Sequence, residues 1–141
     1  MIAEKNRRDL QRMICNRELG RRGEEQAASY IEEQGYTIIG RNVRLGRYEI
    51  DIIAVEAKVL VFIEVKTRRT YRYGLPCEAV NPIKQQHIKQ AAVYFVERLR
   101  RKAMESPLSD PIGSYALRFD IIEVYYTSED HGWLRHMKSC F

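Results

Sequence analysis

EIDIIAVEAKVLVFIEVK, residues 49–66, is the stretch that decides the fold expected of this 141-residue chain. Aliphatic and β-branched residues dominate it, which favours β-structure, and a short polar segment interrupts it at residues 56–58. We therefore predict a hairpin of two strands, residues 48–55 and 59–66. Away from the charges both strands are apolar on both faces, which is typical of a sheet that is covered on each side.

Charged side chains stand at the two ends of this stretch. Every second side chain of a strand points to the same face, so Glu49 shares a face with Asp51, and Glu64 with Lys66. If residues 57–58 form a two-residue turn, Asp51 lies opposite Glu64. In that register Glu49 lies opposite Lys66, and the four charges gather on one face. A slip of one residue would separate the pairs, and the turn lacks the Asn-Gly or Asp-Gly that fixes a register.

Two opposed carboxylates at the mouth of a buried sheet indicate a cation site. At about 4 Å they repel each other by about 4 kcal/mol at the dielectric typical near a protein surface. Lys66 compensates this repulsion in part, and a divalent cation would do so more fully. Mg²⁺, or Mn²⁺ in its place, suits Asp51 and Glu64, and Lys66 is then expected to stabilise negative charge during phosphodiester hydrolysis. The alternative is a half-solvated hairpin whose charges face water.

The sequence around the hairpin predicts helices and further strands. Residues 18–34 carry apolar or small residues at helical spacing, and residues 36–44 are rich in β-formers. A long helix is expected to begin at Asn81 and Pro82, because asparagine caps a helix and proline fits its first turn. Its expected buried stripe has intervals of four residues: Ile83, His87, Ala91, Phe95 and Leu99.

A last strand is predicted at residues 116–126, after a loop rich in proline, glycine and serine. The order helix, three strands, helix, strand predicts an α/β domain with a small mixed sheet flanked by helices. We expect residues 18–141 to form this single domain. Residues 1–17 are interpreted as a basic extension or a marginal helix.

The composition is that of a globular protein, with 45% hydrophobic and 30% charged residues. No apolar run has the length of a membrane span, and residues 1–20 are too charged for a signal peptide, so we expect a soluble cytoplasmic protein. Lysine and arginine number 24 against 19 acids, a net charge of +5, which favours polyanions such as nucleic acid as partners.

The cysteines and histidines do not predict a metal or disulfide framework. Cys15, Cys77 and Cys140 are far apart and form no C-x-x-C pair, so structural zinc and disulfides are not expected. His131 and His136 stand near Cys140, but nothing completes a ligand set at a familiar spacing. We interpret these three tail residues as surface residues.

The spacing Asp51-x12-Glu64-Val-Lys66 resembles the core motif of the PD-(D/E)xK nuclease superfamily, whose members have a restriction endonuclease-like fold. Further segments in consistent order resemble the YraN-type family of small bacterial proteins, which are predicted to be endonuclease-like: GRRGEEQA (20–27), FIEVKTR (62–68), YGLPCEAV (73–80) and RFD (118–120). This resemblance covers about residues 20–125. The layout is also similar to archaeal Holliday junction resolvases, in which a helix glutamate joins the strand acids.

The resemblance implies a Mg²⁺-dependent endonuclease that acts on DNA, with branched or damaged DNA in repair or recombination as the expected substrate. The implied catalytic residues are Asp51, Glu64, Lys66 and the helix glutamate, which by position is Glu24. The role of Glu49 stays open between ligating metal, pairing with Lys66 and neither. The chain departs from the family at Tyr48, where glycine is usual, so a ring beside the acids would narrow access to them.

Nucleic-acid contacts are expected next to the acids, where basic residues follow the catalytic lysine or begin the second helix: Arg68, Arg69, Arg72 and Lys84. The alternative function is a nucleic-acid-binding or adaptor protein that keeps the fold with weak or no hydrolysis. A third reading is a protein-interaction role in which DNA has no part. A junction-cleaving enzyme would need two active sites, hence a homodimer.

Overall fold

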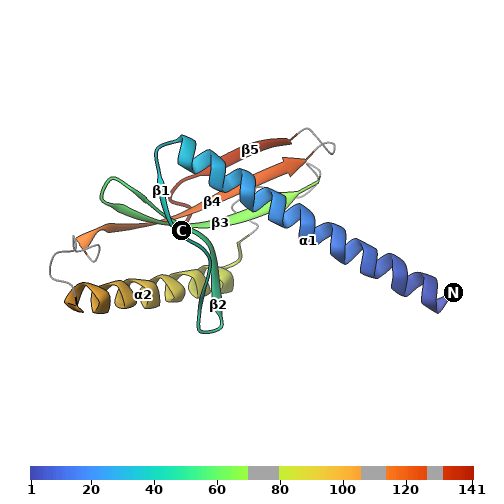
Figure 1. Ribbon diagram of the computed structural model, residues 1–141, viewed down its shortest axis with the longest axis horizontal. Helices are drawn as coiled ribbons and strands as arrows, with labels where there is room; N and C mark the ends of the chain where they lie inside the picture. The colour runs from blue at the N-terminus through green and yellow to red at the C-terminus, as the bar shows by residue number, and fades with distance from the viewer. Residues whose placement is uncertain (70–79, 106–113, 127–131) are drawn as a thin grey trace.

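The computed structural model describes residues 1–69, 80–105, 114–126 and 132–141, which form a five-stranded sheet flanked by two helices (Figure 1). The helices are α1 (Ile2–Glu33) and α2 (Pro82–Glu105). The strands are β1 (Thr37–Leu45), β2 (Tyr48–Glu56), β3 (Val59–Arg68), β4 (Ala116–Tyr126) and β5 (Gly132–Met137). They stand in the order β1-β2-β3-β4-β5. Strands β3 and β4 run parallel and the other neighbours antiparallel, which confirms the predicted mixed sheet.

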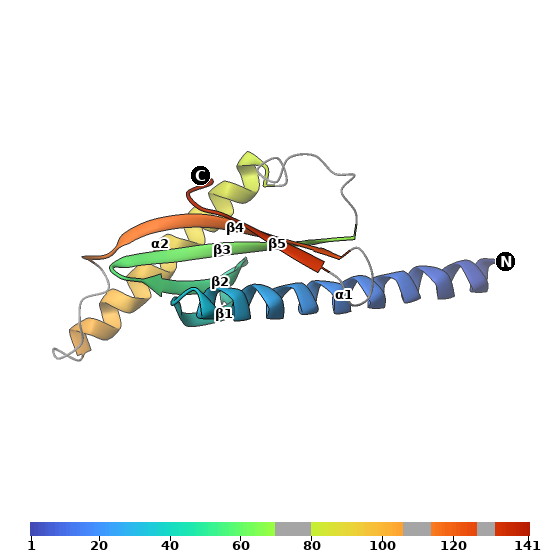
Figure 2. The same ribbon diagram turned by 90° about the horizontal axis from the view of Figure 1, so that it is seen from above.

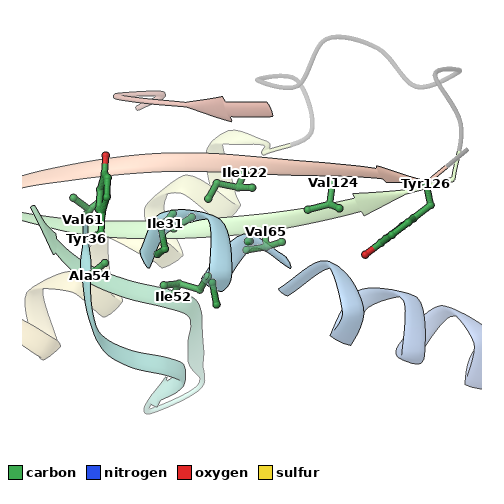
Figure 3. Packing of buried hydrophobic residues seen from close by; sticks show 12 residues of the cluster. Ile31, Tyr36, Ile52, Ala54, Val61, Val65, Ile122, Val124 and Tyr126 are labelled. Atoms are coloured by element: carbon green, nitrogen blue, oxygen red, sulfur yellow. The ribbon is translucent and has the colours of Figure 1, made fainter. Parts of the chain in front are cut away.

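The two helices cover opposite faces of the sheet (Figure 2). Under α1, Ile31 packs with sheet residues such as Ile52 and Ile122 (Figure 3). Under α2, Phe95 meets Phe62 edge to face, with ring centroids 6.1 Å apart. Both faces of β2 and β3 are therefore buried, as their continuous apolar sequence predicted.

The hairpin has the predicted register, with Glu56 opposite Val59 and Ile52 opposite Ile63. Ala57 takes the left-handed conformation that the tight turn requires, with a φ of 51°. A slip of one residue would instead have sent the pair Asp51 and Glu49 to the face opposite Glu64 and Lys66.

Helix α1 differs from the prediction at its start, because it begins at Ile2 and runs without a break to Glu33. Residues 1–17 are thus the first half of the same helix and project beyond the sheet (Figures 1 and 2). Within the described residues, no helix is both long and apolar enough to cross a membrane.

The predicted stripe of α2 is wrong in its first half. Ile83 is 65% exposed and His87 is also exposed, whereas Ile88, Ala91, Ala92 and Phe95 are buried. Intervals of four residues turn by about 40° per step around a helix of 3.6 residues per turn, so such a stripe leaves the buried face. The observed residues follow the mixed spacing of three and four that keeps to one side.

Strand β5 was not predicted, and it changes the interpretation of the tail. The His136 side chain is only 5% exposed, and its Nε2 lies 2.7 Å from Asp120 Oδ2, so its assignment to the surface was wrong. Cys140 is half-buried, and its thiol donates a hydrogen bond to the Met137 carbonyl. The physical reason is that β5 pairs with β4 and brings this tail across the sheet. His131 and Cys77 lie outside the described residues.

A candidate active site at the end of the β2–β3 ladder

Asp51 stands where the regular pairing of β2 with β3 ends. The last paired residues are Ile52 and Ile63. One residue further, Asp51 Oδ2 accepts a hydrogen bond of 2.8 Å from the backbone N–H of Val65. In a continued ladder, a backbone carbonyl of β2 would accept this hydrogen bond. Here the Asp51 side chain accepts it instead, so the carboxylate lies between the two strands.

Glu64 is the acid on the facing strand, and two lysines share one of its oxygens. Lys66 Nζ lies 3.2 Å and Lys84 Nζ lies 3.6 Å from Glu64 Oε1. The Glu64 side chain is 7% exposed, whereas those of Lys66 and Lys84 are 29% and 41% exposed. A buried carboxylate is therefore flanked by two ammonium groups that still reach solvent.

Burial and the negative charge of Glu64 raise the pKa of Asp51 from its usual 3.8 to about 7. The charge of Glu24 raises this pKa further, while the Val65 N–H and the charge of Lys84 oppose the rise. The shift means that a second negative charge stays unfavourable at this position even with the two lysines nearby, unless a further cation binds. Perturbation by burial and a like charge is typical of functional carboxylates.

Glu24 reaches the site because α1 approaches β3 very closely. Gly23 is buried against Thr67, and a β-carbon at this glycine would collide with the Thr67 hydroxyl. Glu24 follows directly, is half-buried, and lines a shallow pocket together with Lys66 and Arg69. The helix glutamate implied by the resemblance therefore lies on the side of α1 that faces the end of β3.

Glu49 and Tyr48 make their contacts elsewhere. Glu49 forms an exposed ion pair with Arg44 of β1 at 3.5 Å, while Lys66 pairs with Glu64. The ring of Tyr48 packs at a tilt against the ring of His87 of α2, with centroids 4.9 Å apart. The structure thus brings Asp51, Glu64, Lys66 and Glu24 together and directs Glu49 towards β1.

The residues expected to contact nucleic acid have different surroundings. Arg69 is exposed at the end of β3, and Arg68 before it is half-buried. Lys84, at the start of α2, forms an ion pair with Glu64. It therefore also belongs to the acid cluster, the group that Asp51, Glu64 and Glu24 form with Lys66. Arg72 lies outside the described residues.

One buried acid beside the site was missed by the sequence analysis. Glu123 of β4 is fully buried and is the register partner of Lys66 across the parallel pair. The hydroxyl of Tyr125 donates to Glu123 Oε2, and Oε1 has no hydrogen-bond partner within the described part of the chain. Its place inside the apolar run of residues 121–126 was the available signal in the sequence. Its neighbour Lys66 becomes known only when β4 is paired with β3.

The donor set can be compared with what a cation requires. Among the described residues, no three His, Cys, Asp or Glu side chains are grouped as a metal site. Mg²⁺ typically takes only one or two carboxylates and completes its shell with waters and substrate phosphates. Asp51, half-buried beside Glu64 with a pKa raised to about 7, fits that requirement. We therefore regard these two carboxylates as the residues that would hold it.

The five-stranded sheet and its two helices form a mixed α/β chain, which is consistent with a small restriction endonuclease-like fold. The chain belongs to the family described as Uncharacterised protein family UPF0102, which matches residues 23–124. A UPF0102 protein of Caldicellulosiruptor saccharolyticus is 44% identical over 109 residues, covering 77% of this chain and 83% of that protein. One from Geobacter sulfurreducens is 43% identical over 126 residues, covering 89% and 90%. This membership agrees with the YraN-type resemblance.

Proposed function

We propose that this protein is a metal-dependent endonuclease that hydrolyses phosphodiester bonds of DNA. The observation that carries the proposal is the pair of adjacent carboxylates, Asp51 and Glu64, with the ammonium group of Lys66 3.2 Å from Glu64. Carboxylates for a divalent cation next to a lysine are the groups that phosphodiester hydrolysis needs.

Each residue has a role that follows from its surroundings. Asp51 is fixed by the Val65 N–H, so its orientation does not depend on a ligand. Lys66 and Lys84 share one oxygen of Glu64, and when that oxygen binds another cation, both ammonium groups can neutralise charge on a phosphate. A bound Mg²⁺ or Mn²⁺ supplies Lewis-acid chemistry to the phosphate and to water.

The substrate class follows from the superfamily resemblance and from the basic residues beside the site. Branched or damaged DNA in repair or recombination is the proposed target. Arg69, exposed directly after β3, would contact a phosphate next to the one that is cleaved. Cleavage of a four-way junction would require two copies of the chain.

A second candidate is a nucleic-acid-binding or adaptor protein with weak or no hydrolysis. The observation that favours it is the double ion pair of Glu64, whose oxygen is already neutralised by Lys66 and Lys84. A cation would have to compete with both lysines. If it cannot, the same cluster would act only as a rigid, electrostatically balanced part of a binding surface.

Cleavage assays on purified protein decide between these functions. Single-stranded, duplex, flapped and four-way DNA are incubated with Mg²⁺ or Mn²⁺, and Asp51→Asn and Lys66→Ala are compared with the wild type. Glu33→Gln, an exposed change at the far end of α1, serves as the control. Cleavage that both site variants lose and the control keeps is the expected result. DNA binding without cleavage on any substrate would favour the adaptor function instead.

A further inference from the structure

The described side chains in the first half of α1 take no part in the core. The buried contacts of this helix come from its second half, where Ala27, Ala28 and Ile31 face the sheet. Residues 4–18 are exposed, and the arm, residues 1–17, extends beyond the sheet edge in both views (Figures 1 and 2). The family match begins only at residue 23, so the arm precedes the matched part of the chain.

One face of the arm is basic and borders a pocket. Lys5, Arg8 and Arg12 are three and four residues apart, a spacing that places side chains on the same side of a helix. They line the pocket together with Arg69 from the end of β3. Two acids, Glu4 and Asp9, also line it, so its described residues carry more positive than negative charge.

This pocket continues towards the candidate active site. Asn16 and Arg69 line both it and the shallow pocket that contains Lys66 and Glu24. A continuous track therefore runs from the start of α1 to the catalytic lysine of the proposed site. Lys5 and Arg12 are about 10 Å apart along the helix axis, which corresponds to about three phosphates of one strand.

The opposite face of the arm offers a different kind of surface. Leu10, Met13 and Ile14 are exposed by 58%, 55% and 52%, and they lie around the other side of the helix from Arg12. Such a stripe could pair with a second copy of the chain. Charge complementarity with a polyanion and continuity with the acid cluster favour the basic face as the functional one.

We propose that Lys5, Arg8 and Arg12 bind the sugar-phosphate backbone of the DNA strand whose phosphodiester lies at Lys66, so that the arm holds the substrate. This inference rests on the proposed function for its ligand. It adds a binding surface outside the residues that match the family and outside the acid cluster.

A pair of charge-matched variants tests the inference. Lys5→Ala/Arg8→Ala/Arg12→Ala removes the basic face, and Arg7→Ala/Arg17→Ala/Arg21→Ala removes three exposed arginines from the opposite face. Binding of a fluorescent DNA duplex is measured by anisotropy in EDTA at several salt concentrations, so that no cleavage is needed. Circular dichroism shows whether both variants keep their helix content.

The expected result is a difference in salt dependence. The slope of log K against log salt should lose about 0.9 for each phosphate contact, hence about 2–3 units in the basic-face variant. The opposite-face variant should lose less than one unit. In a cleavage assay the basic-face variant should raise KM and leave kcat near the wild-type value.

An equal loss of salt slope in both variants would mean that only the net charge matters. No loss of slope in either variant would mean that the arm does not contact DNA. Each result would overturn the inference. A dimer that Leu10→Ser/Ile14→Ser dissociates, with the basic-face variant unchanged in salt slope, would assign the arm to self-association instead. The binding assay contains EDTA and does not depend on cleavage. If the protein binds DNA through the arm but cleaves no substrate, the proposed catalysis is contradicted and the proposed role of the arm is not.

Discussion

Two aspartates on different strands of the same sheet, the half-buried Asp51 and the fully buried Asp120, have opposite surroundings. Asp120 is fully buried, and it accepts hydrogen bonds from Arg118 at 2.8 Å and from the Ser139 N–H at 3.0 Å, with His136 Nε2 at 2.7 Å. Asp51 has one backbone donor and the carboxylate of Glu64 as a neighbour. The cost of burial is offset by these partners at Asp120 and is left largely uncompensated at Asp51.

The pKa values follow this difference. Burial alone would raise the pKa of Asp120, but the hydrogen bonds of His136, Arg118 and Ser139 outweigh it and lower this pKa below the usual value. At Asp51, burial and Glu64 together raise the pKa to about 7. A carboxylate with its own donors holds the fold together, whereas one that lacks them is open to a cation from solution.

The largest effect is expected from removing the donor of the satisfied acid. Arg118→Met takes away the guanidinium that binds Asp120, Glu56 and the Tyr36 hydroxyl, and leaves Asp120 buried with less compensation. We expect a loss of about 3–5 kcal/mol in the free energy of unfolding. Urea denaturation measures this free energy. An unchanged denaturation midpoint would contradict a stabilising role for these hydrogen bonds.

Asp51→Asn should produce the opposite combination of effects. It keeps an acceptor for the Val65 N–H and removes the repulsion with Glu64, so the protein should remain folded and lose no stability in metal-free buffer at pH 8. Cleavage should fall by about 10²–10³-fold, a typical loss for removal of one catalytic electrostatic group. A variant that cleaves as well as the wild type would exclude Asp51 from the site.

The dependence of stability on pH should distinguish the two acids. The folded-state pKa of Asp51 is raised, so ionised Asp51 reduces stability as pH rises from about 4 to 7. In EDTA, Asp51→Asn should therefore gain stability relative to the wild type across that window. The folded-state pKa of Asp120 is lowered, so its contribution is present above its usual pKa of 3.8 and is lost on further acidification. Thermal melts from about pH 3 to 8 measure the loss at Asp51 and the beginning of the loss at Asp120.

The smallest effect is expected at the edge of the site. Glu49→Gln breaks an exposed ion pair with Arg44, which is 82% exposed, and should cost less than about 1 kcal/mol. Its effect on cleavage should be far smaller than that of Asp51→Asn. Losses of equal size in the two variants would instead make Glu49 a ligand and extend the site towards β1.

The hairpin and its charges could be predicted because their information is local. The strands of residues 49–66 are apolar on both faces, and a two-residue turn at residues 57–58 gives the register in which Asp51 falls opposite Glu64; the pairing of Ile52 with Ile63 confirms that register. Glu24 was predicted only from the family resemblance. The sequence of a single helix turn does not show which end of the sheet that turn contacts.

The other features depend on contacts between distant segments. Lys84 was expected to bind nucleic acid, and its ion pair with Glu64 appears only when α2 is docked on the sheet. Glu123 and His136 take their environments from the pairing of β4 with β3 and β5. The short strand β5 has no apolar run long enough to indicate it, which is why its histidine was assigned to the surface.

Helix α1 has a mechanical consequence through the close contact of Gly23 with Thr67. The helix is continuous, so its start lies about 30 Å from this contact while Glu24 is the very next residue. The second half of α1 is packed on the sheet, so the arm is a rod that is held at one end only. A force applied at Lys5 therefore acts on the Gly23–Thr67 contact over a lever arm of about 30 Å, whereas Glu24 lies beside the held end.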